Sequence, residues 1–131
     1  MKFSASLKNS PQSHQVSLKV GEKEQTLPIG PKPSGGSSVT GGELLFLALA
    51  TCFCNDIYRE GARQGITVKN VQVEVEGDFE AERQPASNII YRVSVDADAS
   101  EDKIQELIQY VDSIAEIQNT LRIGTPVTLQ I

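Results

Sequence analysis

The sequence predicts an α+β protein in which antiparallel sheets pack around one long, buried central helix. Eleven consecutive residues, 44–54, carry no charge, which is typical of a helix that is covered on nearly every side. Segments in which apolar and polar residues alternate stand before and after this run, as in strands with one buried face. A stretch rich in Gly, Pro and Ser, 28–40, separates the first strands from the helix.

Length, charge and cysteine content exclude several classes of protein. A chain of 131 residues is expected to form a single domain over 1–131. Its formal net charge of −5 argues against a nucleic-acid partner. The apolar run is shorter than the roughly 20 residues needed to cross a bilayer, so no membrane partner is expected. The start of the chain has no apolar signal region, and two cysteines make no secreted disulfide framework; we therefore expect a cytoplasmic location.

The N-terminal third predicts a small antiparallel sheet. Apolar and polar residues alternate in 2–8 and again in 14–20, and Gly21-Glu22 then suits a turn before a third short strand. These hairpin strands are expected within 2–29. The loop at 30–40 that follows is either functional or a plain connector.

The central helix is predicted over 41–64. Thr40 followed by Glu43 forms a capping box just before the apolar run, and Gly65 is a natural C-cap. The polar tail of the helix is expected to return to solvent. Its polar residues begin with Asn55 and Asp56, which could line a pocket but are preferred as solvated residues, and continue with Arg59, Glu60 and Arg63.

The second half of the chain predicts a β-hairpin over 66–97, a helix over 100–113 and a strand over 126–131. Valines alternate with acidic residues in the first hairpin strand, which indicates one buried and one wet face. Ser100 is a good N-cap. Ile117 belongs either to a continuation of the apolar stripe of this helix or to a short separate helix.

The central helix is hard to cover completely with 131 residues. The sheet covers one side and the second helix another, which leaves a third side of the helix without a partner in the chain. We therefore predict a homodimer with this helix at or near the interface, most simply a two-fold one.

The two cysteines, Cys52 and Cys54, lie about 200° apart around the helix axis and point in different directions. A disulfide between them would require the helix to unwind. With one His in the chain, a metal site on both is also disfavoured, and no cofactor is expected. From chemistry alone, a buried structural cysteine is the leading interpretation, since a reactive thiolate needs a neighbouring cation. His14 could act as a base or ligand, but a partly buried structural histidine is the preferred interpretation.

The segment at 41–53 resembles the OsmC/Ohr family of osmotically inducible and organic hydroperoxide resistance proteins; it reads GGELLFLALATCF. Members of that family read roughly Asn-Pro-Glu-Glu-Leu-Leu, then small and apolar residues, then Ala-Cys-Phe. The sequences GITV at 65–68 and VQVEV at 71–75 fit the strand that follows the helix in the family. The resemblance covers most of the chain after residue 28. It implies an OsmC-like fold and an intertwined homodimer with active sites at the dimer interface.

The resemblance also implies a reaction, the thiol-dependent reduction of organic hydroperoxides. Cys52 takes the position of the peroxide-reactive cysteine, and Glu43, next to the position of the family's glutamate, is the candidate for an assisting carboxylate. A thiolate attacks the O–O bond of an organic hydroperoxide and becomes a sulfenic acid. Cys54 or an external thiol reductant would then resolve that acid.

Three positions depart from the family pattern. Ala115 and Glu116 stand where a late cysteine is expected. Gly42 stands where the family has its glutamate, with Glu43 as its neighbour. No arginine precedes Arg59, although the family draws an activating arginine from its N-terminal part.

Two functions therefore stay open. The first is an OsmC-like thiol peroxidase of altered type. The alternative is an OsmC-fold dimer that binds a small apolar ligand at the dimer interface without peroxidase activity, since a fold does not fix a function. A thiol pKa of Cys52 well below 7 would support the enzyme, and a value above about 8.5 would support a structural cysteine.

Overall fold

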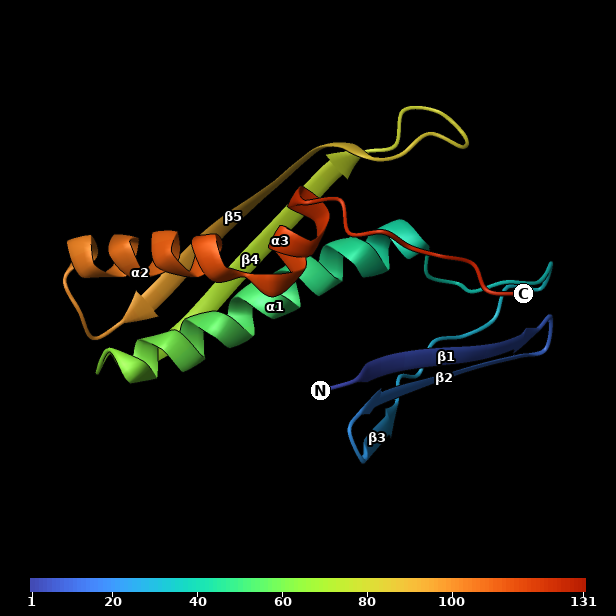
Figure 1. Cartoon of the computed structure of the whole chain (residues 1–131), viewed down its shortest axis with the longest axis horizontal. Coiled ribbons are helices and arrows are strands. Elements are labelled where there is room, and N and C mark those ends of the chain that lie inside the picture. Colours follow the sequence, from blue (N-terminus) through green and yellow to red (C-terminus); the bar gives the residue numbers. More distant parts are fainter. The chain divides into compact units, whose positions relative to one another are not determined.

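The computed structural model describes all residues, 1–131, and confirms an α+β chain with antiparallel sheets (Figure 1). In chain order the elements are β1 (Phe3–Ser10), β2 (Ser13–Val20), β3 (Lys23–Thr26), α1 (Gly41–Arg63), β4 (Val68–Asp78), β5 (Ser87–Ala97), α2 (Glu101–Ile114) and α3 (Glu116–Arg122). The chain divides into two compact units, residues 1–44 and 45–131, each with its own contacts. The single domain expected over 1–131 stays a prediction.

The first unit is a three-stranded antiparallel sheet in the order β1-β2-β3. Its register pairs Phe3 with Val20 and Leu7 with Val16, so the apolar residues share one face, as the alternation predicts. The third strand ends at Thr26, before the predicted limit of the strands at 29. Proline has no backbone N–H for a strand ladder, and Pro28 stands two residues beyond the end.

Both ends of α1 follow the local signals in the sequence. At the start, the Glu43 amide donates to Thr40 Oγ1 at 3.1 Å and the Thr40 amide donates to Glu43 Oε1 at 3.0 Å, which is the predicted capping box. At the end, Gly65 has φ +71° and the Ile66 amide donates to the Gly61 carbonyl at 2.8 Å. This is the Schellman arrangement that a C-cap glycine permits. Neither α1 nor another helix of the chain combines the length and apolar character required to cross a membrane.

The core of the second unit lies between α1, α2 and the inner face of the β4–β5 hairpin. Its fully buried side chains are Phe53, Ile57, Leu107 and Val111. The register of the hairpin pairs Val73 with Val93. Both valines pack against the core cluster from the sheet. The sheet and the helices thus form two layers, as Figure 1 shows.

In a single chain α1 is covered on one face only. The buried residues of the helix recur at helical spacing and comprise Leu49, Phe53, Asp56, Ile57, Glu60 and Gly61. By contrast, Leu47 is 57% exposed and Tyr58 is 44% exposed. These two apolar side chains are open to solvent in the single chain, and a second chain that would cover them stays a prediction.

The C-terminal part agrees with the helix predicted over 100–113 and decides between the two alternatives for Ile117. α2 begins after Ser100, whose Oγ accepts from the Lys103 amide at 3.3 Å, and a separate helix, α3, follows a break at Ala115. The alternative of a short separate helix is therefore the correct one.

The strand predicted over 126–131 is wrong for the single chain, because these residues form no regular element. A strand requires a neighbour for its backbone N–H and C=O groups, and the chain provides none there: neither sheet includes the segment. Its apolar side chains are consequently open to solvent, with Val127 99% exposed.

Candidate functional site

The two cysteines of α1 are both free thiols, and their side chains lie in different surroundings. Cys52 donates from Sγ to Asp56 Oδ2 at 3.8 Å, and its sulfur faces the backbone amides of Glu116 and Ile117 at the start of α3. Cys54 instead lines a groove of about 250 Å³ between α1 and β4. The other residues of this groove are Ala50, Thr51, Asn55, Val71 and Val73. The prediction that the two thiols point in different directions is confirmed.

The junction between α2 and α3 lies beside Cys52 because Gln118 fixes α3 to α1. Gln118 is buried, and its Nε2 donates to the Leu49 carbonyl at 3.1 Å, three residues before Cys52. Ala115, at the junction, is fully buried. The place where the resemblance puts a second cysteine is thus next to the Cys52 thiol, but alanine and glutamate occupy it.

The surroundings of Cys52 favour the protonated thiol. Burial raises the pKa of the Cys52 thiol above its ordinary value. The backbone amides of Ile117 and Glu116 oppose this rise in the pKa, whereas the carboxylates of Asp56 and Glu116 add to it. A pKa raised in this way agrees with the interpretation of Cys52 as a structural cysteine and not with an activated resting thiolate.

A row of acidic and basic side chains follows Cys52 along the same face of α1. Asp56 is 4% exposed and Glu60 5% exposed. Arg59 Nη2 pairs with Asp56 Oδ1 at 2.8 Å, and Arg63 Nη1 pairs with Glu60 Oε2 at 2.8 Å. A buried carboxylate is tolerated when a cation pairs with it, and here each one pairs with an arginine three residues later. Arg59 Nε also lies 3.8 Å from Glu60 Oε2.

The expectation that the whole polar tail of α1 returns to solvent is therefore wrong for Asp56 and Glu60. Both share the helical face of the buried apolar residues. Sequence reasoning missed Asp56 as part of the Cys52 environment. The available signal was spacing, since residues four and seven positions after Cys52 lie on the same side of a helix.

Glu43 is committed to the helix cap. Its Oε1 accepts from the Thr40 hydroxyl at 2.7 Å as well as from the Thr40 amide. These hydrogen bonds hold the pKa of the Glu43 carboxyl below its ordinary value. The structure brings Asp56 and the start of α3 to the Cys52 thiol, whereas Cys54 lies at the groove beside β4.

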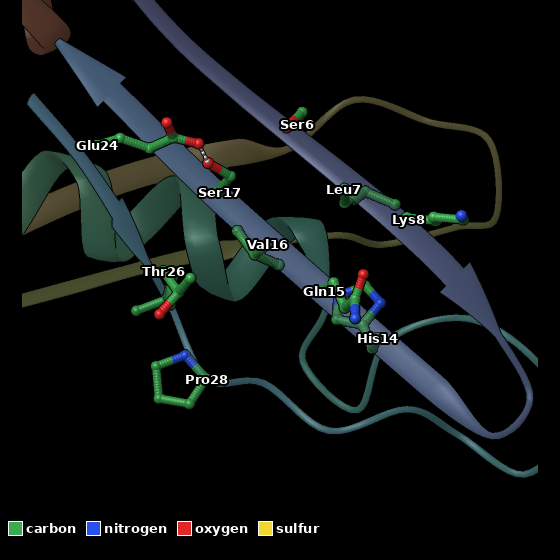
Figure 2. A pocket seen from close by; sticks show the side chains of 11 residues that line it. Ser6, Leu7, Lys8, His14, Gln15, Val16, Ser17, Glu24, Thr26 and Pro28 are labelled. Atoms are coloured by element: carbon green, nitrogen blue, oxygen red, sulfur yellow. Dashed lines mark hydrogen bonds between the residues drawn. The ribbon is translucent and has the colours of Figure 1, made fainter. Parts of the chain in front are cut away.

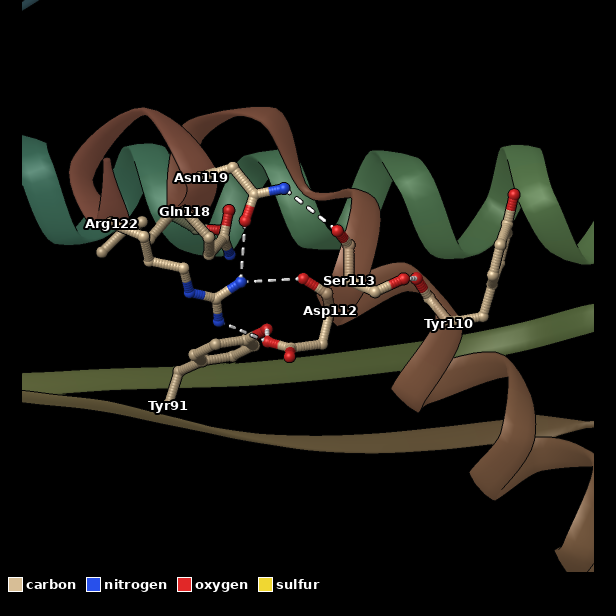
Figure 3. Close-up of polar contacts among 8 residues, drawn as sticks. Tyr91, Tyr110, Asp112, Ser113, Gln118, Asn119 and Arg122 are labelled. Atoms are coloured by element: carbon tan, nitrogen blue, oxygen red, sulfur yellow. Dashed lines mark hydrogen bonds and ion pairs between the residues drawn. The ribbon is translucent and has the colours of Figure 1, made fainter. Parts of the chain in front are cut away.

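A second polar cluster ties β5 to both C-terminal helices (Figure 3). The Tyr91 hydroxyl donates to Asp112 Oδ1, and Arg122 Nη2 pairs with the same oxygen at 2.7 Å. Arg122 Nη1 also donates to the Asp112 carbonyl at 2.9 Å and to Asn119 Oδ1 at 3.0 Å. Because Tyr91 also packs edge-on against Phe53, with ring centroids 5.2 Å apart, the cluster fixes the α2–α3 junction beside the residue that follows Cys52.

This cluster predicts a loss of stability at alkaline pH. Burial, and then the hydrogen bond to Asp112, raise the pKa of Tyr91 above its ordinary value. The unfolded chain releases the tyrosine proton above about pH 10 while the folded chain keeps it, so the free energy of unfolding falls as the pH rises through this range. Urea midpoints at about pH 9 and about pH 11 should differ less in Tyr91→Phe than in the wild type. Tyr110→Phe, at an exposed position of α2, is the matched control, and equal differences in all three proteins would contradict the prediction.

A pocket of about 480 Å³ lies on the first unit (Figure 2). Its polar lining includes Ser6, Lys8, Gln15, Ser17, Glu24 and Thr26. Ser17 Oγ donates to Glu24 Oε1 at 2.8 Å, and nearby His14 has its Nδ1 2.9 Å from Asn9 Nδ2. That contact agrees with the interpretation of His14 as a structural residue.

No group of three or more His, Cys, Asp or Glu side chains gathers anywhere in residues 1–131 in a way that would hold a metal ion.

Comparison with known proteins gives one consistent family. A family model described as OsmC-like protein matches residues 34–130. The OsmC-like protein of Mycoplasma pneumoniae is 19% identical over 93% of this chain and 88% of its own, with a TM-score of 0.65. An OsmC-like protein of unknown function from Vibrio cholerae is 14% identical over 92% and 93%, with a TM-score of 0.64. An organic hydroperoxide resistance protein from Legionella pneumophila is 17% identical over 93% and 90%, with a TM-score of 0.54. No curated protein matches the chain.

Proposed function

We propose, from the premise that this chain belongs to the OsmC-like protein family, that it reduces organic hydroperoxides with the thiol of Cys52. The observation that carries the proposal is the place of this thiol. It is a half-buried side chain in the middle of α1, and it faces the α2–α3 junction where the family resemblance expects the thiol chemistry. A similar fold from Legionella pneumophila bears the name of an organic hydroperoxide resistance protein, which supports the same substrate class.

The proposed reaction uses one protein thiol and an external thiol reductant. The sulfur of Cys52 attacks the distal peroxide oxygen, the O–O bond breaks, and the alcohol leaves as Cys52 becomes a sulfenic acid. One external thiol then forms a mixed disulfide with Cys52 and releases water, and a second external thiol displaces Cys52 as a free thiol. Cys54 faces the groove beside β4, so we assign the resolving step to the external thiol. A cytoplasmic location, where thiols are kept reduced, fits this requirement.

Turnover measurements test the proposal. Reduced protein with cumene hydroperoxide and excess dithiothreitol should consume peroxide faster than dithiothreitol alone. Cys52→Ser should reduce consumption to that background, and Cys54→Ser, the matched thiol control on the same helix, should retain the wild-type rate. Absence of turnover above background in the wild type would contradict the proposal, as would equal loss in both variants.

A second candidate function is the binding of a small apolar ligand between two copies of the chain. Two observations favour it, the raised pKa of the Cys52 thiol and the exposed apolar side chains Leu47 and Tyr58 on α1. A homodimer would cover these side chains and could supply a neighbouring strand for the exposed segment 126–131. A dimeric mass in light scattering, together with no peroxide turnover, would favour this function over the first.

A further inference from the structure

Cys52, Asp56 and Arg59 form a hydrogen-bonded line along one face of α1. Asp56 uses its two oxygens for different partners, with Oδ2 accepting from Cys52 Sγ at 3.8 Å and Oδ1 pairing with Arg59 Nη2 at 2.8 Å. The carboxylate is almost completely buried, whereas the side chain of Arg59 is 44% exposed. Arg59 therefore holds the carboxylate from the solvent side through Oδ1, and Oδ2 is directed at the thiol.

We propose that Asp56 accepts the proton of the Cys52 thiol during attack on the substrate and passes it to the leaving group. This assignment rests on the proposed function and names a catalytic residue for it, in a site where no arginine contacts the sulfur. The charged side chains that face the thiol are Asp56 on α1 and Glu116 on α3. Both are acidic and neither would stabilise a resting thiolate, and the nearby Arg59 pairs with Asp56.

The step balances without any further reactant. As the Cys52 sulfur attacks the distal oxygen of the hydroperoxide, its proton moves to Asp56 Oδ2 and the O–O bond breaks. The sulfur loses two electrons and keeps the distal oxygen with its hydrogen as a sulfenic acid. The peroxide bond gains those electrons, and the departing alkoxide takes the proton from Asp56 and leaves as an alcohol. Asp56 thereby returns to its carboxylate form.

This role and a merely electrostatic role predict opposite effects of Asp56→Asn. The carboxylate raises the pKa of the thiol, so its removal increases the fraction of thiolate at neutral pH. If Asp56 were only a nearby charge, Asp56→Asn would react faster at neutral pH. If Asp56 accepts the proton, the variant reacts more slowly although its thiol ionises more readily, because positioned proton transfer typically accelerates a step by roughly 100-fold or more.

The test follows a single turnover of full-length Cys54→Ser protein, in which Cys52 is the only thiol. Its loss is measured with cumene hydroperoxide and, separately, with iodoacetamide, which also requires the thiol to give up its proton. The absorbance of the thiolate is titrated in parallel. Adding Asp56→Asn should lower the rate at neutral pH at least about 10-fold while the thiol titrates at lower pH. The rate constant of this variant should then change with pH in proportion to its thiolate fraction. The rate constant of the parent protein should be higher at neutral pH than its thiolate fraction alone would give.

Controls separate the outcomes. Arg63 pairs with Glu60 rather than with Asp56, so Arg63→Gln should leave the rate unchanged. Should Asp56→Asn fail to fold, the parent protein still tests the proposal, because a proton in transfer makes its reaction slower in D₂O than in H₂O. An equal or faster rate in D₂O, or in Asp56→Asn, would overturn the role of Asp56. If Asp56→Asn slows the reaction with iodoacetamide but neither protein reacts with peroxide, the proposed function is refuted and Asp56 keeps only its role as acceptor of the thiol proton.

Discussion

Replacing Phe53 with alanine is expected to lower the free energy of unfolding by about 3–5 kcal/mol. The ring is fully buried at the centre of the second unit, in one cluster with Ile57, Leu107 and Val111. It also makes the edge-on contact with Tyr91. Alanine would leave a cavity that three separate elements line, and such a cavity closes poorly because each element is held by its own backbone hydrogen bonds.

Urea unfolding followed by far-ultraviolet circular dichroism measures this loss. Gln109→Ala, an exposed position of α2, is the control and should change the free energy of unfolding by no more than about 0.5 kcal/mol. A loss below about 1 kcal/mol for Phe53→Ala would show that this ring does not hold α1 to the β4–β5 sheet. Since Phe53 follows Cys52 directly, the experiment also shows how firmly the backbone of the thiol is anchored.

The parts of the fold that the sequence predicts well depend on neighbours in the chain. Thr40, Glu43 and Gly65 define the two ends of α1 because caps are made within one turn of the helix. The alternation around Val73 predicts its inward face because side chains of a strand change sides at every residue. Ser100 likewise begins α2, through a hydrogen bond to an amide three residues later.

The parts that sequence reasoning did not predict depend on distant partners. A strand at 126–131 requires another strand beside it, and alternation alone cannot say whether one exists. Asp56 and Glu60 read as solvated residues because acidic side chains usually lie at the surface. Their burial follows from the packing of the helix face they share with Ile57, together with the arginines one turn further along.

In the candidate site, too, some features follow from neighbours in the sequence and others from distant parts of the chain. Helical geometry alone separates the directions of Cys52 and Cys54. What surrounds each thiol depends on tertiary structure: α3 lies over Cys52 because Gln118 binds the Leu49 carbonyl, and β4 lies beside Cys54. The resemblance implies a thiolate at Cys52, but the pKa of this thiol depends on burial and on two acidic neighbours that no motif records.

The second large effect expected concerns the product of oxidation. After treatment of reduced wild-type protein with one equivalent of cumene hydroperoxide and then dimedone, we expect a dimedone adduct on Cys52 alone, with Cys54 still a free thiol. The physical reason is that a disulfide needs both sulfurs within bonding distance. Cys52 and Cys54 point to different sides of a continuous helix, and no other cysteine is present in the sequence.

Peptide mass spectrometry of this oxidised protein shows whether Cys52 alone carries the thiol chemistry. Reaction at a single thiol predicts that the peptide containing both cysteines carries one dimedone group on Cys52, and that the Cys52→Ser variant carries none. A disulfide between Cys52 and Cys54 would contradict the account, because it would require α1 to unwind at its centre. Labelling of Cys54 in place of Cys52 would contradict it equally, by moving the reactive thiol to the groove beside β4.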